Sequence, residues 1–190
     1  MTDTTATAEN RYIEVELGTV DQLFNLMDPS PFVARDLDGD AEEFIFNWAR
    51  EYSPDEHVTL RIYVAKWPDN DPTHMLTEAV HNFFAYREKL AQREFRLLMK
   101  QGRTSLLIGL VFLVACLSVV QLVLVPIMTP WAAIVRESLT IAGWVAMWKP
   151  MQMFLYDWWP VLERSRVYGK LSQMPVEVIR KRPMYGIDPD

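Results

Sequence analysis

The stretch TSLLIGLVFLVACLSVVQLVLV, residues 104–125, contains no Asp, Glu, Lys, Arg or His over 22 residues. As an α-helix it extends about 33 Å at about 1.5 Å per residue, enough to cross a hydrocarbon core of about 30 Å. The sequence therefore predicts a membrane protein whose first span is this stretch.

A second apolar region, residues 132–159, contains four charged side chains. We predict a second span over residues 138–156, kinked at its proline. Arg136 and Glu137 then lie at the outer headgroups, where charges cost little, or form a pore-mouth pair. Lys149 is predicted to extend toward the inner surface or to reach Asp157 on the same helix face.

Basic residues lie at only one end of each predicted span. The connecting turn, residues 126–133, has no Lys or Arg. Positively charged flanks favour the cytoplasmic side, which predicts a multi-pass protein with both termini in the cytoplasm. The residues at the other ends of the spans are Arg87, Lys89, Arg93, Arg96, Lys100, Arg103, Arg164, Arg166 and Lys170.

Charge is unevenly distributed along the chain. Residues 1–86 contain 17 acidic and 5 basic side chains, a net of −12, whereas residues 87–190 have a net charge of +6. The acidic part excludes nucleic-acid binding of the usual kind, which needs clustered Lys and Arg against phosphates. The N-terminus carries no apolar run typical of a signal peptide, so we expect no export of the N-terminal part.

The sequence before the first span predicts a small α+β cytosolic domain, residues 11–103. It follows a polar tail, residues 1–10, that we expect to be disordered. Alternating apolar and polar residues indicate two strands, at 12–17 and 57–66. Because a two-stranded sheet is marginal alone, we expect it to be roofed by helices or extended by another chain.

Two helices are predicted in this domain. Residues 40–52 carry a single apolar stripe, which places Phe44 and Trp48 in the core, and a nearby Asp caps the helix. From Thr73 one long helix is predicted to pack on the sheet and to continue into the first span. The fold class is thus an α+β domain joined by a long helix to a transmembrane hairpin, residues 104–159, with a basic cytosolic tail, residues 160–190.

Small residues at four-residue spacing let membrane helices approach closely. We predict that such residues pack the two spans as a hairpin, or that the same face makes an oligomer. The candidates are Gly109 in the first span and Ser138, Ala142 and Ala146 in the second.

Metal and enzyme motifs are weak or absent. His74, Glu78 and His81 share a helix face, a spacing that metals use, although an exposed polar face explains it better. The acidic run that begins at Asp36 lacks the Gly and Glu of a calcium loop at the required positions. The sequence contains no phosphate-cradling Gly-rich loop, GxSxG, HExxH or CxxC motif, so we expect a non-enzymatic protein without a cofactor. The lone Cys116 is predicted to be a small packing residue.

Two segments, DPSPF…DLDGDAEEFIFNWARE (28–51) and GWVAMWKPMQMFLYDWWP (143–160), resemble an uncharacterised family of bacterial two-span inner-membrane proteins. The resemblance implies location in the bacterial inner membrane and brings no activity with it. The architecture is similar to mitochondrial calcium uniporter subunits, but the turn VPIMTPW lacks the Asp and Glu of their W-D-I-M-E-P pattern.

Two functions are consistent with these sequence features. The first is a membrane-anchored interaction or assembly module whose acidic domain meets a protein partner, with the lipid bilayer as its other contact. The second is a subunit of a homo-oligomeric channel or transporter, with a path lined near Arg136, Glu137 and Lys149. Two spans cannot enclose a pore, so the second function requires several copies.

Overall fold

The computed structural model describes residues 11–26, 29, 35–53, 56–127 and 129–181. The expected tail at residues 1–10 lies outside this range. The chain divides into two compact units. The first comprises residues 1–90 and 164–190, and the second comprises residues 91–163.

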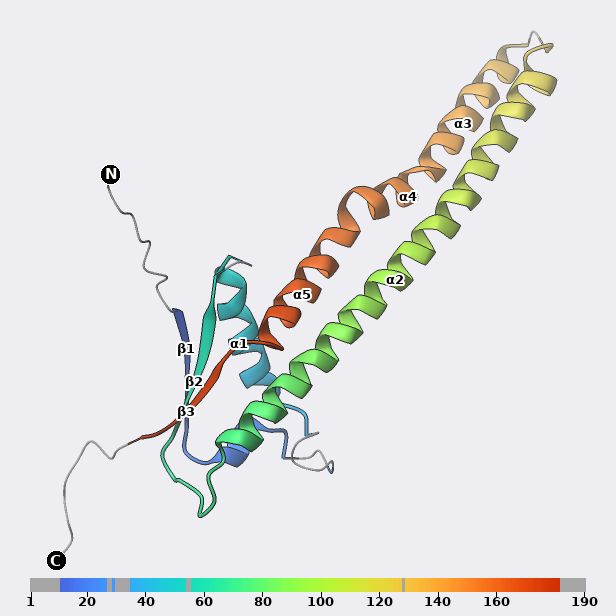
Figure 1. Cartoon of the computed structure of the whole chain (residues 1–190). Helices are drawn as coiled ribbons and strands as arrows, with labels where there is room; N and C mark the ends of the chain where they lie inside the picture. Colours follow the sequence, from blue (N-terminus) through green and yellow to red (C-terminus); the bar gives the residue numbers. More distant parts are fainter. Residues whose placement is uncertain (1–10, 27–28, 30–34, 54–55, 128, 182–190) are drawn as a thin grey trace, which may run out of the picture. The chain divides into compact units, whose positions relative to one another are not determined.

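The first unit contains a three-stranded parallel sheet in the order β1-β2-β3 (Figure 1). Its strands are β1 (Arg11–Leu17), β2 (Val58–Val64) and β3 (Val176–Arg180). The prediction of two strands was wrong, because the segment taken for a basic tail supplies β3. That segment alternates over only a few residues, and its pairing with β2 depends on a partner far away in the sequence.

The strands are connected by helices, so the unit is a mixed α and β fold. A short 3₁₀ helix, η1 (Val20–Leu23), and α1 (Gly39–Glu51) connect β1 to β2. As predicted, an aspartate caps α1: the Asp38 carboxylate accepts a hydrogen bond from the Asp40 N–H at 3.1 Å. Such caps satisfy a backbone donor that the helix itself leaves unpaired.

One face of the sheet forms the core. Ile13 of β1 and Leu60 and Ile62 of β2 are at most 1% exposed. Leu76 and Phe84 of α2 (Thr73–Val119) and Leu171 of α5 (Trp158–Leu171) are also fully buried in this unit. Since side chains alternate along a strand, the residues between these face the opposite way.

The inward placement of Phe44 and Trp48 was wrong. Both side chains are more than 40% exposed, whereas their neighbours Ile45 and Ala49 are buried. The apolar stripe of α1 is wide enough for either Phe44 and Trp48 or Ile45 and Ala49 to face the core. The smaller pair, Ile45 and Ala49, faces it.

One long helix, α2 (Thr73–Val119), follows β2 and continues as a π-helical turn, η3 (Val120–Leu124). The prediction of a nearly continuous helix is confirmed. It is the one described helix that is long and apolar enough to cross a membrane, and only 17% of its most apolar window is buried.

The return path consists of several helical segments: α3 (Pro130–Ala146), α4 (Trp148–Gln152), a π-helical turn η4 (Met153–Asp157) and α5 (Trp158–Leu171). The predicted interruption near Pro150 is present as a turn at Met147. Proline lacks an N–H, and its ring conflicts with the carbonyl four residues earlier, which here belongs to Ala146.

Candidate interaction surface on the open face of the sheet

The face of the sheet opposite the core carries polar and aromatic side chains in register. Glu14 of β1 is paired with Arg61 of β2, and Arg61 with Glu177 of β3. In a parallel sheet, paired residues point to the same side, so these three side chains form a row across the strands. Tyr12 and Tyr63 point to the same face at alternate positions. We call these five residues the open-face cluster.

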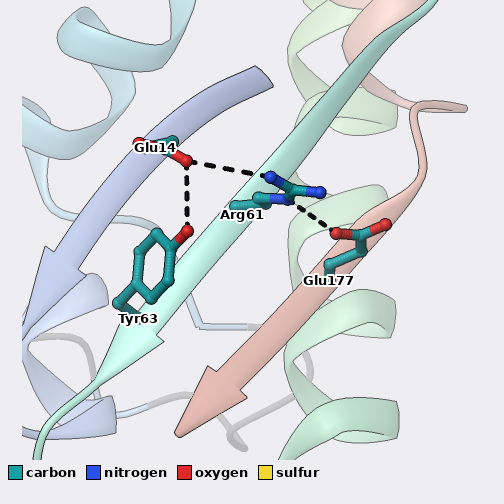
Figure 2. A network of polar contacts seen from close by, with 4 residues as sticks. All are labelled: Glu14, Arg61, Tyr63 and Glu177. Atoms are coloured by element: carbon teal, nitrogen blue, oxygen red, sulfur yellow. Dashed lines mark hydrogen bonds and ion pairs between the residues drawn. The ribbon is translucent and has the colours of Figure 1, made fainter. Parts of the chain in front are cut away.

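Arg61 is the centre of the open-face cluster (Figure 2). Its Nε donates to Glu177 Oε2 at 2.8 Å, and its Nη1 lies 3.9 Å from Glu14 Oε1. The guanidinium carbon lies 3.4 Å from the centroid of the Tyr12 ring, a cation–π contact. The Tyr63 hydroxyl donates to Glu14 Oε1 at 3.1 Å. One cation is thus held between two carboxylates and an aromatic ring.

These contacts shift the pKa of two members of the cluster, Arg61 and Tyr63. The hydrogen bond to Glu177 raises the pKa of Arg61, which therefore remains charged. The hydrogen bond from Tyr63 to Glu14 raises the pKa of the phenol, which therefore remains neutral near physiological pH. The cluster presents the Arg61 guanidinium, two carboxylates and two aromatic rings, all of which are groups that can contact a binding partner.

Among the described residues, helices lie over the core face of the sheet and not over the opposite face (Figure 1). Within the part of the chain that the structure describes, the Glu14 and Glu177 side chains are about half exposed. All-parallel sheets are usually covered on both faces. An uncovered face bearing Tyr and Arg has the composition of protein–protein interfaces.

A second polar cluster joins three helices of the same unit. Arg87 of α2 donates from Nε to Glu42 Oε1 of α1 at 2.6 Å, and the Tyr168 hydroxyl of α5 donates to the same oxygen at 2.9 Å. Burial, followed by the Glu42 carboxylate, raises the pKa of Tyr168. Burial lowers the pKa of Arg87, but Glu42 outweighs it and the net shift is upward. Sequence reasoning missed this cluster, because its members lie far apart in the chain.

Of the four predicted packing residues, Gly109 and Ala146 lie at a contact between α2 and α3. A Cβ at Gly109 would lie 3.0 Å from the Ala146 carbonyl oxygen. Ser138 and Ala142 are exposed. The residue that packs inward is Gly143, where a Cβ would lie 2.9 Å from Leu113 Cδ1 and 3.4 Å from Cys116 Cβ. Cys116 is buried there.

The charged residues of the second apolar region lie at two places. Lys149 Nζ is 3.9 Å from Asp157 Oδ2, which is the second of the two placements predicted for Lys149. Arg136 Nη2 donates to the Leu124 carbonyl at 3.4 Å, and its buried Nε has no partner among the described residues. Glu137 is exposed. The structure does not bring Arg136 and Lys149 together as lining residues of one site.

The three residues predicted as possible metal ligands line one open pocket but are not arranged around a single ion. His74 Nδ1 lies 3.8 Å from Glu78 Oε2, while His81 Nε2 lies 2.8 Å from the Met174 carbonyl. Within the described ranges, no group of three or more His, Cys, Asp or Glu side chains is placed to hold a metal ion. His81 instead helps to fix the segment before β3.

No protein-family model matches the chain, and it matches no curated protein and no solved structure. Function is therefore inferred from geometry and charge.

Proposed function

We propose that this protein is a two-span membrane protein that holds a small cytosolic domain at the bilayer, and that the domain is a non-enzymatic interaction module. The observation that carries the proposal is the pairing of β2 with β3. These strands precede and follow the whole apolar part of the chain, yet they lie in one sheet.

This pairing constrains how often the chain crosses a membrane. Two hydrogen-bonded strands lie on the same side of any bilayer, so the chain between them crosses it an even number of times. If residues 104–124 cross once, a second crossing has to follow before β3. The segments α3, α4 and η4 supply the residues for it, although the turn at Met147 interrupts their helix.

The exposure of apolar side chains supports the same proposal. Soluble proteins rarely expose large contiguous apolar patches. In the second unit, large apolar side chains are exposed on both arms of the hairpin; examples are Leu107, Ile108, Val111, Phe112, Ile134, Ile141, Trp144, Val145 and Trp148. A lipid environment is the solvent in which this pattern is stable, because lipid tails are themselves apolar.

The positively charged flanks favour a cytoplasmic sheet domain with both termini in the cytoplasm, and the resemblance to a bacterial inner-membrane family supports a location in that membrane. The charges on the open face of the sheet indicate the chemistry of its partner. That face carries Glu14, Glu16 and Glu177 against Arg61 and Lys181, in a domain whose first part is strongly acidic. We propose a protein surface with Lys or Arg side chains as its occupant. The mutual contacts of the open-face cluster hold its side chains in place before binding, which reduces the entropy lost on association.

Labelling of introduced cysteines tests the topology. In a Cys116→Ser background, Glu14→Cys and Glu177→Cys are expected to react with a membrane-impermeant maleimide only after permeabilisation. Thr129→Cys, in the connecting turn, is expected to react in intact spheroplasts. Labelling of Glu14→Cys and Glu177→Cys on opposite sides would contradict the even number of crossings, and absence of Thr129→Cys labelling in intact spheroplasts would contradict the orientation.

Photo-crosslinking tests the interaction surface. With p-benzoylphenylalanine at position 63, we expect one protein adduct in cells, absent with the same probe at Tyr86, an exposed aromatic residue on α2 of the same unit. The yield of the adduct should fall in the Glu14→Gln/Glu177→Gln variant. The yield should also fall at high salt, because the contact is partly ionic. The adducted peptide, identified by mass spectrometry, should be rich in Lys or Arg. A homodimer adduct, or equal adducts from both positions, would refute this surface.

A further inference from the structure

We infer that four basic side chains on one face of α2 bind the headgroups of acidic phospholipids in the cytoplasmic leaflet. The four residues are Arg93, Arg96, Lys100 and Arg103, which we call the basic stripe. All of them belong to the second unit and lie within the eleven positions that precede the uncharged stretch, residues 104–125. The inference rests on the proposed membrane topology and adds a ligand that the topology alone does not require.

The spacing of the basic stripe places its members on one side of the helix. They follow one another at intervals of three, four and three residues, inside one uninterrupted α-helix. At 3.6 residues per turn, these positions fall within an arc of about 80°. Like charges at such spacings repel one another, so an anion bound along the stripe relieves that repulsion.

No anion of the described chain balances the basic stripe. All four residues are exposed, and none of their side chains forms a hydrogen bond or an ion pair with another described residue. Other cations of the same chain are paired, as Arg87 is with Glu42 and Lys149 is with Asp157. The stripe therefore presents four cations whose N–H groups are available to an external ligand.

The aromatic residues of the return arm mark the level of the bilayer interface. A Cβ at Gly102 would lie 3.3 Å from Phe154 Cζ, so Phe154 lies at the level of Gly102 within this unit. Tyr156 and Trp159 follow Phe154 and are 69% and 64% exposed. Such aromatic residues are typical of membrane interfaces. Together with the end of the uncharged stretch, they indicate that the boundary falls near Gly102, at the lower end of the basic stripe.

The length of the basic stripe gives its members different roles. The interfacial layer of one leaflet is about 5–8 Å thick, whereas the helix rises about 15 Å from Arg103 to Arg93. Arg103 and Lys100 therefore reach the lipid phosphates directly, where an Arg guanidinium donates two parallel N–H bonds and a Lys ammonium adds a point charge. Arg96 and Arg93 lie beyond the layer but within about one Debye length, about 8 Å at physiological ionic strength.

Acidic phospholipid is the occupant that this placement favours. Clusters of four or more Lys and Arg residues directly next to a membrane span attract anionic lipids. An acidic protein segment carries the same charge, but two of the four cations lie at the depth where lipid phosphates are already concentrated. The expected ligand is thus the phosphate diester of a lipid with a net negative charge.

Lipid titration of the full chain tests the inference. The protein in neutral detergent is titrated with phosphatidylglycerol or phosphatidylcholine, and the bound lipids are counted by native mass spectrometry. We expect phosphatidylglycerol to bind about tenfold more tightly or better. A polyglutamate peptide serves as a third probe. Equal affinity for the two lipids, or a peptide that binds and displaces phosphatidylglycerol, would overturn the inference.

Three double variants test the basic stripe itself. Lys100→Gln/Arg103→Gln is expected to lower the affinity for phosphatidylglycerol about tenfold or more, because it removes the direct contacts. Arg93→Gln/Arg96→Gln should lower it about threefold at low ionic strength and have no effect at high salt, since these charges act through solvent. The control Lys66→Gln/Arg180→Gln removes one Lys and one Arg from exposed positions outside α2 and should change the affinity less than about twofold. Equal losses in all three variants would show an effect of net charge alone and refute the stripe.

Alkaline extraction separates failure of this inference from failure of the proposed function. The protein is reconstituted into phosphatidylcholine vesicles and washed at alkaline pH, which removes proteins that do not span the bilayer. A protein that resists extraction but shows no preference for phosphatidylglycerol contradicts the lipid site alone. A protein that is extracted contradicts the proposed membrane topology and, with it, the lipid site.

Discussion

Replacement of Gly143 by leucine is expected to force apart the two apolar helices of the hairpin. A Cβ at this position already meets Leu113 Cδ1 at 2.9 Å and lies 3.4 Å from Cys116 Cβ. Even small additions to a packed site cost about 1–3 kcal/mol, and leucine adds four carbon atoms. Alanine is expected to have a much smaller effect, because the Leu113 methyl group lies at the end of a flexible side chain.

The single cysteine of the chain reports this change directly. Cys116 is 4% exposed, so it reacts with an alkylating agent mainly when the helices separate. Each loss of about 1.4 kcal/mol raises the separated population about tenfold, and the alkylation rate of Gly143→Leu in detergent should rise accordingly. The matched control is Ala142→Leu, at an exposed neighbouring position. If both variants react at the same rate, this contact does not hold the hairpin together.

Replacement of Glu42 by alanine is expected to destabilise the sheet domain strongly, because Glu42 joins three of its helices. It removes the acceptor of both the Arg87 and the Tyr168 hydrogen bonds and leaves the Arg87 charge without its partner. Breaking a buried ion pair costs about 3–5 kcal/mol, but the Arg87 side chain is 38% exposed and solvent screens part of this. We therefore expect a loss of about 2–3 kcal/mol in the free energy of unfolding.

Chemical denaturation of the full chain, followed by circular dichroism, measures this loss. Glu43→Ala is the matched control: Glu43 is exposed on the same helix, and such changes are usually within about 0.5 kcal/mol. In the Glu42→Ala background, Arg87→Met should restore part of the stability, because it removes the unpaired charge. A Glu42→Ala variant as stable as its control would contradict the role assigned to this cluster.

The elements that the sequence predicts well are those set by local periodicity. The alternation around Ile13 and Ile62 identified β1 and β2, and the uninterrupted helical pattern after Thr73 identified α2. The cap at Asp38 was also predictable, because capping involves neighbouring residues. In each case the signal lies within a few residues of the structure it specifies.

The features that were missed depend on contacts between distant parts of the chain. β3 is short, and its register is set by β2. Arg61 is the centre of the open-face cluster only because β1 and β3 bring Glu14 and Glu177 to its two sides. On α3 the small residues occupy adjacent faces, so spacing alone did not distinguish Ser138 from Gly143. A fragment of residues 11–103 would lack both β3 and Tyr168, which makes it an incomplete version of the domain.

The position of β3 after the hairpin also orders the synthesis of the protein. The ribosome releases β1, α1 and β2 first, and domains generally fold in that direction as they emerge. One edge of β2 therefore stays unpaired until both apolar segments have been synthesised. An unpaired strand edge can pair with another chain and lead to aggregation. If the chain crosses the bilayer twice, as proposed, a molecule whose return segment fails to cross cannot deliver β3 to that edge. Completion of the sheet would then depend on the second crossing.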